Sequence, residues 1–395
     1  MTRRVEPAAA ADAEGARQPT AASLRLLVLE PDPSHGGGSE AVILSLAREL
    51  AARGHEVGLL HESRGSMLPD YRAFVVEHMR IRLPGFSFRA PFATMGSVLG
   101  IARAARRFRA DALLTSHLGF LRHCALVRTF TGIPSCFHLG LPLTASMPSL
   151  RIALPRVGHG IAPSNHTLQT WHAGGWPMDA LDAVPNWVDA ARFRPVEDVR
   201  ALRAELGLPP DGRLLVFVGR VCEQKGVDVL LRAFARLAPG HEDVTLAVAG
   251  GIAGDYRATL DATLGELDDA VRRRIVLVPV TAVPEKYYAA ADVACAPSVS
   301  DEAFGLTVLE AMACAVPVVT TPVGIIPDIV GDDDHALLAP AGDPDALAER
   351  LEFWLGPTAP RDACGARLRA RVQQGFGPDA SVDAYEAVLA GLARR

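Results

Sequence analysis

The sequence predicts an α/β protein with two doubly wound, Rossmann-like domains, each built on a parallel sheet. The chain has 395 residues, which suits two domains of about 150–200 residues better than one. Hydrophobic residues make up 49% of the chain and charged residues 22%, so two cores can be filled. Short apolar runs alternate with helical patterns in each half, which is typical of parallel strands covered by helices on both faces.

The elements follow from these patterns in order along the chain. In the first half, apolar runs predict strands at residues 24–29, 57–61, 112–116, 134–138, 160–162 and 183–184. Helical periodicity there predicts helices at 40–53 and 93–108. In the second half, strands are expected at 214–218, 245–249, 275–278, 293–296, 316–320 and 336–338. Helices are expected between them at 227–237, 256–267, 307–313 and 344–355.

Breaks in this alternation divide the chain. Phe193-Arg194-Pro195 ends the first series, and the turn at 209–212 precedes the second. We therefore expect, in order, a disordered tail, an N-terminal domain, a C-terminal domain and a final helix that packs back on the N-terminal domain: 1–22, 23–190, 191–377 and 378–395. Ligands of such sheets bind at the carboxyl ends of the strands, so a cleft is expected there.

Charge and cysteine content restrict the class of protein. A net charge of −5 gives no general attraction to nucleic acid or to anionic membranes. The six cysteines have no C-x-x-C spacing, which indicates reduced thiols in a cytoplasmic protein. No run approaches twenty apolar residues and no signal-peptide core is present, so we expect a soluble protein.

A candidate phosphate site lies in VFVGRVCEQKG, residues 216–226. Gly219 allows a sharp turn after a strand, and Arg220 and Lys225 then carry two cations suited to two phosphates. Only one other lysine, Lys286, occurs in the chain, so a lysine within this motif is unlikely to be accidental. The alternative is a solvent-exposed loop that carries charges without a ligand.

A second candidate lies in SDEAFGLTVLEAMACAVPVV, residues 300–319. The backbone N–H groups of 304–306 begin a helix, and helix N-termini bind phosphate. Glu302 in the preceding loop can accept hydrogen bonds from sugar hydroxyls, and Glu310 within the helix can reach a ribose diol. A surface role for Glu310 is disfavoured by its apolar neighbours, because an unpaired carboxylate among them is costly.

These residues resemble the retaining glycosyltransferases of family 4, which have the GT-B fold. The resemblance rests on Glu302-x7-Glu310 with its AFG and EAMACAVPVV, and on GR-x4-KG at 219–226. ADVACAPS at 291–298 and VPNWVD at 184–189 are similar to further motifs of that family. Together these motifs span about half of the chain.

The resemblance implies that the domain at 23–190 binds the acceptor and that the domain at 191–377 binds the nucleotide-sugar. It also implies roles residue by residue. Arg220 and Lys225 would neutralise the donor diphosphate, Glu302 would hold the donor sugar, and Glu310 would bind the ribose. His138, in GIPSCFHLG, matches a family histidine near the donor sugar and would orient it. The donor-binding residues implied are Gly37, Gly38, Gly219, Gly250, Gly251, Val280, Phe304, Gly305, Leu306 and Glu310. No metal and no cofactor are expected, because the two cations would replace a metal.

The first half carries weaker signals. The glycines at 36–38, followed by Ser39 and Glu40, resemble the family's GG-x-E loop. His117 is similar to the second histidine of the family's H-x-H, whose first position is Thr115 here. Other departures are Trp187 in the linker and Gly324, which remains from a GG-x-x-E motif that has lost its second glycine. The residues expected at an acceptor site or cleft are His117, Ser164 and Asn165.

Residues 86–110 combine aromatic residues with arginines on a helical pattern. Such a segment is typical of an amphipathic helix with a solvated basic face, and weak contact with the inner face of a membrane is the alternative.

The resemblance implies a sugar transfer from a nucleotide-sugar, with a UDP-sugar favoured, to an acceptor hydroxyl with retention of anomeric configuration. Two alternatives stay open: a nucleotide-sugar epimerase of GT-B-like fold, and a non-catalytic nucleotide-sugar-binding subunit. The sequence does not identify the donor sugar, its base, the acceptor (glycan, lipid carrier or small metabolite) or the oligomeric state.

Overall fold

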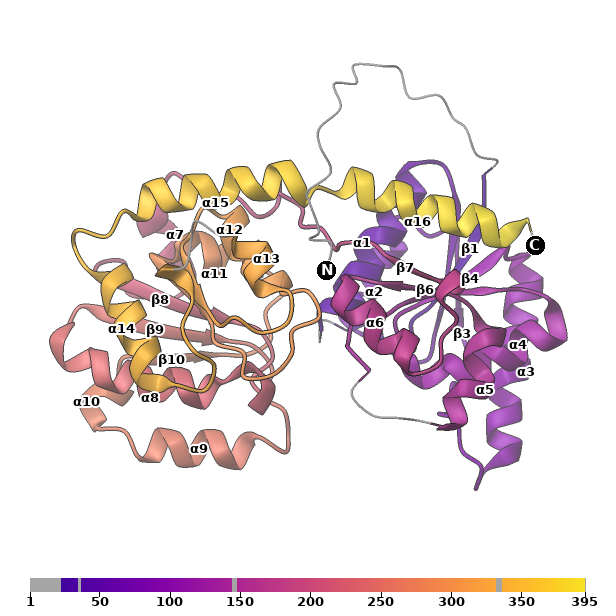
Figure 1. Ribbon diagram of the computed structural model, residues 1–395, viewed down its shortest axis with the longest axis horizontal. Helices are drawn as coiled ribbons and strands as arrows, with labels where there is room; N and C mark the ends of the chain where they lie inside the picture. Colours follow the sequence, from indigo (N-terminus) through magenta and orange to yellow (C-terminus); the bar gives the residue numbers. More distant parts are fainter. Residues whose placement is uncertain (1–22, 35–36, 144–147, 332–335, 395) are drawn as a thin grey trace, which may run out of the picture. The chain divides into compact units, whose positions relative to one another are not determined.

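A computed structural model describes residues 23–34, 37–143, 148–331 and 336–394 of the chain. The predicted tail over 1–22 and Gly36 of the glycine loop lie outside the described residues. The chain divides into two compact units (Figure 1). Of the described residues, the C-terminal unit comprises Trp187–Pro378, and the N-terminal unit comprises those from 23 to 186 together with the segment that begins at Asp379.

The N-terminal unit contains a seven-stranded parallel sheet with the strand order β3-β2-β1-β4-β5-β6-β7. Its strands are β1 (Arg25–Leu29), β2 (Glu56–His61), β3 (Glu77–Arg80), β4 (Ala112–Thr115), β5 (Ser135–His138), β6 (Gly158–Ala162) and β7 (Leu181–Ala183). β1 lies between β2 and β4, and its register runs from Arg25 opposite Glu56 on one side and from Leu26 opposite Ala112 on the other. The interior of β1 is fully buried, as expected for a parallel strand covered on both faces.

Helices connect these strands. They are α1 (Gly38–Ala52), α2 (Leu68–Arg72), α3 (Pro91–Phe108), α4 (Leu121–Thr131), α5 (Pro148–Val157) and α6 (Asn165–Ala173). The unit is completed by α16 (Pro378–Ala393), which follows the whole C-terminal unit in sequence (Figure 1). Ser381 donates to the Pro185 carbonyl at 2.8 Å, and Arg53 after α1 forms ion pairs with Asp383 and Glu386. These contacts attach α16 to the N-terminal unit.

The C-terminal unit contains a five-stranded parallel sheet with the order β10-β9-β8-β11-β12. Its strands are β8 (Arg213–Val218), β9 (Val244–Ala249), β10 (Ile275–Val278), β11 (Val293–Ala296) and β12 (Val318–Thr320). Its helices are α7 (Val199–Glu205), α8 (Val227–Leu237), α9 (Arg257–Gly265), α10 (Asp269–Arg272), α11 (Pro284–Ala290), α12 (Leu306–Ala313), α13 (Ile326–Val330), α14 (Pro344–Leu355) and α15 (Arg361–Gly375).

Helix α8 shows why these segments fold against the sheet. Val227, Leu230, Leu231, Phe234 and Leu237 recur at intervals of three and four residues and therefore share one face. All five are at most 5% exposed. Burying each such side chain contributes about 1.5–3 kcal/mol, so the apolar face determines how the helix packs.

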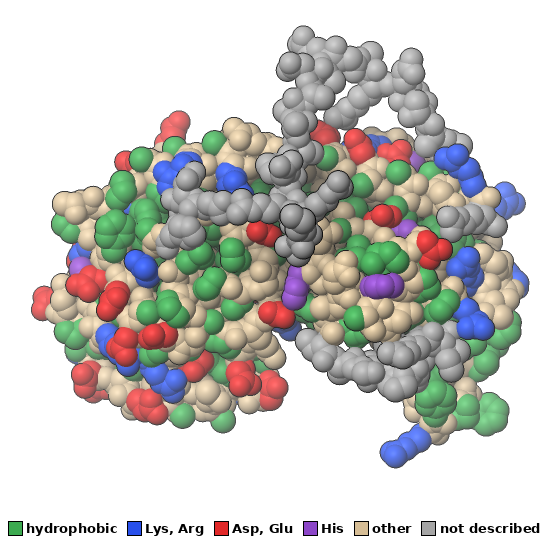
Figure 2. Space-filling view, viewed as in Figure 1, with side chains coloured by type: hydrophobic (Ala, Val, Ile, Leu, Met, Phe, Trp, Pro, Cys, Tyr) green, Lys and Arg blue, Asp and Glu red, His purple; other side chains and the backbone are tan. Residues whose placement is uncertain are grey.

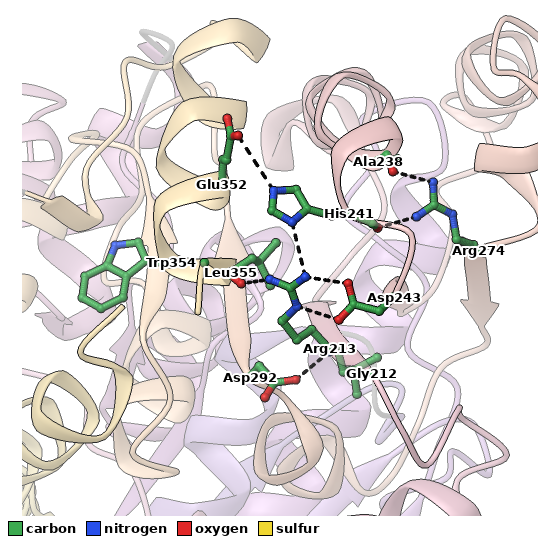
Figure 3. Close-up of polar contacts among 12 residues, drawn as sticks. Gly212, Arg213, Ala238, His241, Asp243, Arg274, Asp292, Glu352, Trp354 and Leu355 are labelled. Carbon is green, nitrogen blue, oxygen red and sulfur yellow. Dashed lines mark hydrogen bonds and ion pairs between the residues drawn. The ribbon is translucent and has the colours of Figure 1, made fainter. Parts of the chain in front are cut away.

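A network of hydrogen bonds links the amino ends of β8 and β9 (Figure 3). Arg213 at the start of β8 donates through Nε and Nη2 to the Asp243 carboxylate before β9, at 2.8 and 2.5 Å, and through Nη1 to the Leu355 carbonyl at the end of α14. The hydrogen bonds from Arg213 lower the pKa of Asp243. This network lies at the end of the sheet opposite the carboxyl ends of the strands, so it has a structural role.

The predicted architecture is confirmed: both sheets are parallel and every predicted strand and helix except 336–338 is present, with boundaries shifted by a few residues. Leu338 makes only an isolated bridge to Thr320, so the strand predicted at 336–338 is wrong. β3 was not predicted, because Glu77–Arg80 is an edge strand with one buried residue and no apolar run. Among the described residues, no helix is both long and apolar enough to cross a membrane.

Candidate functional site

Two glycines end neighbouring strands of the C-terminal unit. Gly219 follows β8 and Gly250 follows β9, with φ values of 153° and 154° that a residue with a side chain rarely adopts. A Cβ atom on Gly250 would overlap the Gly219 carbonyl oxygen, and one on Gly251 would lie 2.9 Å from Val280 Cγ2. The turn after β9 therefore packs directly on the turn after β8, and neither turn carries a side chain at these positions.

Arg220 comes directly after the first of these glycines and is exposed. Its side chain forms no hydrogen bond or ion pair with any residue that the structure describes. Lys225, in contrast, is 19% exposed, and its Nζ donates to Glu302 Oε2 at 2.5 Å. An ammonium has three donors, so this pairing leaves Lys225 able to bind a further anion.

A backbone contact fixes the turn that carries Lys225 against the loop that carries Glu302. Gly226 has a φ of 62°, and a Cβ atom there would overlap the Pro297 carbonyl oxygen. The Val299 N–H donates to the Gln224 carbonyl at 2.9 Å. The two candidate motifs, about eighty residues apart in sequence, are therefore held together by main-chain packing that only glycine permits.

Glu302 is positioned by three neighbours. Ser298 Oγ donates to its Oε2 at 3.1 Å, so Oε2 accepts from both Ser298 and Lys225. Oε1 has no partner among the described residues. Gly324, the glycine kept from the family's GG-x-x-E motif, has a φ of 56° and packs its α-carbon on the Glu302 backbone. The carboxylate is therefore fixed at one oxygen and available at the other.

Helix α12 begins beside Glu302. Gly305 is its N-cap, with a φ of 78°, and no side chain caps the first turn. Phe304 is buried and packs edge-to-face on Phe376, with ring centroids 6.1 Å apart. The first N–H groups of a helix have no intrahelical partner, and together they attract anions. Leu306 is the first residue of this helix, so the predicted backbone donors lie within the same region as Lys225 and Glu302.

Glu310 is half-buried in α12, close to α11. Burial raises the pKa of this carboxyl from 4.5 to about 7, and Glu285 adds to the rise, whereas Arg192 and the Tyr288 hydroxyl act in the opposite direction. Arg192 itself is engaged by Glu285 through Nε and Nη2 at 3.0 and 2.8 Å. Glu310 therefore lacks a full ion-pair partner and exchanges its proton near neutral pH.

In the N-terminal unit, His138 ends β5 and is fully buried. Its Nδ1 lies 2.8 Å from the hydroxyl of Tyr385 in α16, whereas Nε2 has no hydrogen-bond partner among the described residues. Burial lowers the pKa of the imidazole to about 4, so the ring is neutral at pH 7. A neutral ring with one partnered nitrogen can donate or accept one further hydrogen bond at the other.

The predicted glycine loop lies near this histidine. Gly37 is the N-cap of α1 and Gly38 is its first residue. A Cβ atom on Gly140, two residues after His138, would overlap Ser39 Oγ and would lie 3.3 Å from His138 Nε2. The structure thus places the start of α1 and His138 together at the carboxyl end of the sheet.

His117 is partly exposed and pairs with a buried carboxylate. Its Nε2 contacts Oε1 of Glu30, which directly follows β1 and is fully buried. Burial alone would lower the pKa of His117, but the hydrogen bond to Glu30 and the charges of Glu30, Glu40 and Asp32 outweigh it and raise that pKa. Thr115, at the first position of the H-x-H pattern, donates to the Leu29 carbonyl at 2.7 Å and joins the ends of β1 and β4.

The remaining predicted residues occupy a helix start. Ser164 is buried and caps α6, because its Oγ accepts from the Thr167 N–H at 3.2 Å. Its hydroxyl is therefore already used by the fold. Asn165, the first residue of α6, is exposed.

The structure thus joins Lys225 and Glu302 in the C-terminal unit, whereas Gly37 and Gly38, also predicted to bind the donor, lie in the N-terminal unit with His117 and His138. Sequence reasoning missed Ser298, Tyr288, Glu30 and Tyr385. Ser298 lies four residues before Glu302 and was within reach of motif analysis. Tyr385 was not, because it is 247 residues from His138. In the described part of the chain, no cluster of three or more His, Cys, Asp or Glu residues could hold a metal ion, and metal independence stays a prediction.

Each unit matches a known protein family. Residues 36–192 match the family described as Glycosyltransferase Family 4, and residues 198–371 match the family described as Glycosyl transferases group 1. The chain is 39% identical over 220 residues to D-inositol 3-phosphate glycosyltransferase of Kineococcus radiotolerans, a match that covers 51% of this chain and 49% of the relative. The enzyme of the same name from Mycolicibacterium paratuberculosis is 38% identical over 207 residues, covering 52% and 46%. The chain thus spans about half the length of the curated relatives that it matches.

Solved structures resemble the whole chain. Anabaena HepE in complex with UDP and glucose has a TM-score of 0.81 at 20% identity and covers 93% of this chain and 100% of its own. Sucrose-phosphate synthase from Thermosynechococcus elongatus has a TM-score of 0.75 at 22% identity, covering 93% and 98%. At this identity the likeness concerns the fold alone, and it confirms the GT-B fold with two Rossmann-like units.

Proposed function

We propose that this chain is a glycosyltransferase that moves a sugar from a nucleoside diphosphate sugar, with UDP as the favoured nucleotide, to an acceptor hydroxyl. The observation that carries the proposal is the Lys225–Glu302 pair. It joins two loops at the carboxyl ends of the strands, beside an unpaired Arg220 and the start of α12. The proposal is supported by the match of this unit to the family Glycosyl transferases group 1 and by the UDP-bound state of HepE.

In the proposed reaction, Arg220 and Lys225 bind the diphosphate. Both offset the negative charge that grows on the leaving phosphate as the bond to the sugar breaks, which is electrostatic stabilisation in place before the reaction begins. The first N–H groups of α12 add to this field. Glu302 accepts hydrogen bonds from the sugar through Oε1, while Ser298 and Lys225 fix Oε2.

Retention of the anomeric configuration is part of the proposal and rests on the resemblance to retaining enzymes. The acceptor belongs to the N-terminal unit in this scheme. His138 lies buried at the end of β5 with no hydrogen-bond partner for Nε2 among the described residues, and its proposed role is to orient the donor sugar. Inositol 3-phosphate is the first acceptor to test, because the curated relatives carry that compound in their names. A direct way to score retention is to assign the anomeric proton of the product by NMR.

The first experiment is thermal unfolding of the protein with UDP, GDP, ADP and their sugars. A ligand at about a hundred times its dissociation constant adds roughly 2.7 kcal/mol to the free energy of unfolding, which shifts the midpoint by a few degrees. We expect UDP or a UDP-sugar to stabilise the wild type but not Lys225→Ala or Glu310→Ala. If no nucleotide shifts the midpoint of the wild type, the proposal is wrong.

A second measurement separates transfer from the alternatives. The protein is incubated with the stabilising nucleotide-sugar, with and without acceptor, and the products are separated. Release of nucleoside diphosphate that depends on the acceptor supports a transferase. An epimeric nucleotide-sugar formed without acceptor would show an epimerase, and binding without any product would show a non-catalytic subunit.

A further inference from the structure

The exposed face of α3 carries large apolar side chains in a regular stripe. Phe92, Met95 and Leu99 are 92%, 39% and 39% exposed, and Phe88 in the preceding loop is 79% exposed. Phe92, Met95 and Leu99 are spaced three and four positions apart, so they lie along one side of the helix. Large apolar side chains exposed together on one side of a helix are typical of an interaction site.

The same side of the helix becomes basic towards its C-terminus. Arg103 and Arg106 follow Leu99 at the helical spacing of four and three residues, and both are exposed. The opposite face, with Val98, Ile101 and Phe108, is buried in the core of the unit. The buried face of α3 is therefore largely apolar. Its outer face is apolar towards the N-terminus and cationic towards the C-terminus.

No acidic residue interrupts this surface in the sequence. Residues 81–110 contain six arginines and neither Asp nor Glu, in a chain whose net charge is −5. Arg89 and Arg103 have no side-chain hydrogen bond or ion pair with the residues that the structure describes, so both charges are uncompensated. Figure 2 shows hydrophobic and cationic side chains together at the lower right of the view, where Figure 1 draws α3.

Elements next to α3 add further apolar and basic side chains to this surface. Phe130 at the end of α4 is 47% exposed, and Arg106 donates to its backbone carbonyl, so this end of α4 lies beside α3. On the other side, an open groove of about 540 Å³ runs between β3 and α3 and is lined by Arg80, Arg103 and Arg107. Glu77 at this groove pairs with Arg107 at 2.8 Å, which leaves the balance of charge positive.

We infer that this surface, made of Phe88, Arg89, the outer face of α3 and Phe130, docks on an anionic lipid bilayer. Phe88, Phe92 and Met95 would enter the boundary between head groups and acyl chains, where aromatic and apolar side chains are stabilised. The arginines would pair with lipid phosphates. Charge favours this occupant: an anionic leaflet complements the arginines, whereas a second copy would oppose one cationic face to another.

The inference does not depend on the proposed function, and its test needs no substrate. The full chain is mixed with vesicles of phosphatidylcholine alone or of phosphatidylcholine with phosphatidylglycerol, and bound protein is recovered by flotation. We expect binding to the anionic vesicles only, and a marked decrease in binding at high ionic strength. Absence of binding to anionic vesicles at low salt would overturn the inference.

Three variants locate the surface. Phe88→Ser with Phe92→Ser, and separately Arg89→Glu with Arg103→Glu, should each reduce the partition coefficient at least about tenfold. Phe353→Ser removes a 51% exposed ring from α14 of the other unit and should bind like the wild type. The changed side chains are exposed, so all three proteins should unfold at the wild-type temperature.

Two outcomes would contradict the inference despite folded variants. One is wild-type binding by the Phe88 and Phe92 double variant, which would place the membrane contact elsewhere. The other is a dimer in solution that this variant dissociates, without vesicle binding by the wild type. That result would assign the surface to contacts between copies of the chain.

Discussion

The two units of this molecule differ in how their candidate site residues are held in position. In the C-terminal unit, Lys225, Glu302 and Ser298 are joined by hydrogen bonds, and the elements that carry them are fixed by glycines within the same two motifs. In the N-terminal unit, His138 and His117 depend on partners from distant parts of the chain, Tyr385 and Glu30. A site for phosphate can be encoded in short loops, whereas the environment of a buried imidazole is assembled by the whole fold.

The largest effect is expected from the local motif. Lys225→Ala removes a cation from the proposed diphosphate site and should lower kcat/KM by about a hundredfold to a thousandfold, as for other losses of charge stabilisation. Lys286→Ala is the matched control, because Lys286 pairs with Glu205 at the surface of the same unit. Steady-state kinetics with the nucleotide-sugar that stabilises the wild type give the comparison. Equal activity in both variants would end the assignment of Lys225.

Loss of the Tyr385 hydroxyl, the long-range partner of His138, should lower activity less than loss of Lys225, and it should lower kcat without changing nucleotide binding. Tyr385→Phe leaves His138 Nδ1 without its partner, and a lost hydrogen bond of this kind is worth about a tenfold change. We expect kcat to fall by about that factor while the dissociation constant of the nucleotide stays at its wild-type value, since Tyr385 is a positioning residue for His138 in the other unit.

Tyr71→Phe provides the control for this change. Tyr71 is as deeply buried in the same unit, but its hydroxyl has no hydrogen-bond partner among the described residues. Its removal should leave kcat unchanged. If Tyr385→Phe weakens nucleotide binding as much as it lowers kcat, Tyr385 does not act only as a positioning residue for His138.

Glu310 gives a prediction that depends on pH. Its pKa is raised from 4.5 to about 7, so between these values the folded state keeps a proton that the unfolded state releases. The contribution of Glu310 to stability therefore falls as the pH rises from about 4.5 to about 7 and is level above. Glu310→Gln has no titrating group at this position, so its free energy of unfolding does not fall for this reason. The difference in free energy of unfolding between Glu310→Gln and the wild type should therefore increase by about 2 kcal/mol over that range.

Denaturant unfolding of both proteins at about pH 5 and about pH 8 measures this difference. Binding offers a second readout. A carboxylate accepts two ribose hydroxyls better than a carboxylic acid, so the affinity for a UDP-sugar should rise with pH through about 7 in the wild type and stay constant in Glu310→Gln. An unchanged stability difference would mean that Glu310 is ionised throughout this range.

The smallest effect is expected at ion pairs. Arg53 is 18% exposed and contacts Asp383 and Glu386 of α16, whereas Arg257 and Asp261 form an exposed pair within α9. Arg53→Ala should lower the free energy of unfolding by about 1 kcal/mol, and Arg257→Ala by close to zero. Urea unfolding at low and high salt tests both values, because salt should reduce the Arg53 effect. If both variants lower the free energy of unfolding equally, the ion pairs between Arg53 and α16 stabilise the protein no more than an exposed pair within one helix.

The sequence was sufficient where the pattern is local. Apolar runs located β8, β9 and β11, because each is buried on both faces, and the E-x7-E motif located Glu302 and Glu310 on a loop and a helix. The glycine turn at Gly219 was also expected, since its φ excludes most side chains.

Other features could not be obtained from local patterns. Helix α15 was not predicted: it buries only Cys364, Gly365, Leu368 and Val372, too narrow a stripe for its apolar periodicity to be recognised. Gly365 packs its α-carbon against the Ala315 backbone, a close approach that depends on the tertiary fold. The ring environment of His138 and the pKa of Glu310 depend in the same way on residues that come together only after folding.

The return of α16 to the N-terminal unit has a consequence for synthesis on the ribosome. Residues 187–378 emerge before α16 does, so the C-terminal unit can fold while the N-terminal unit still lacks the helix that holds His138. During that interval, the surface that α16 covers is exposed to solvent and to chaperones. The N-terminal unit is therefore translated first but receives its last helix only at the end of synthesis. A truncation before Pro378 would remove α16 and leave the unit without this helix permanently.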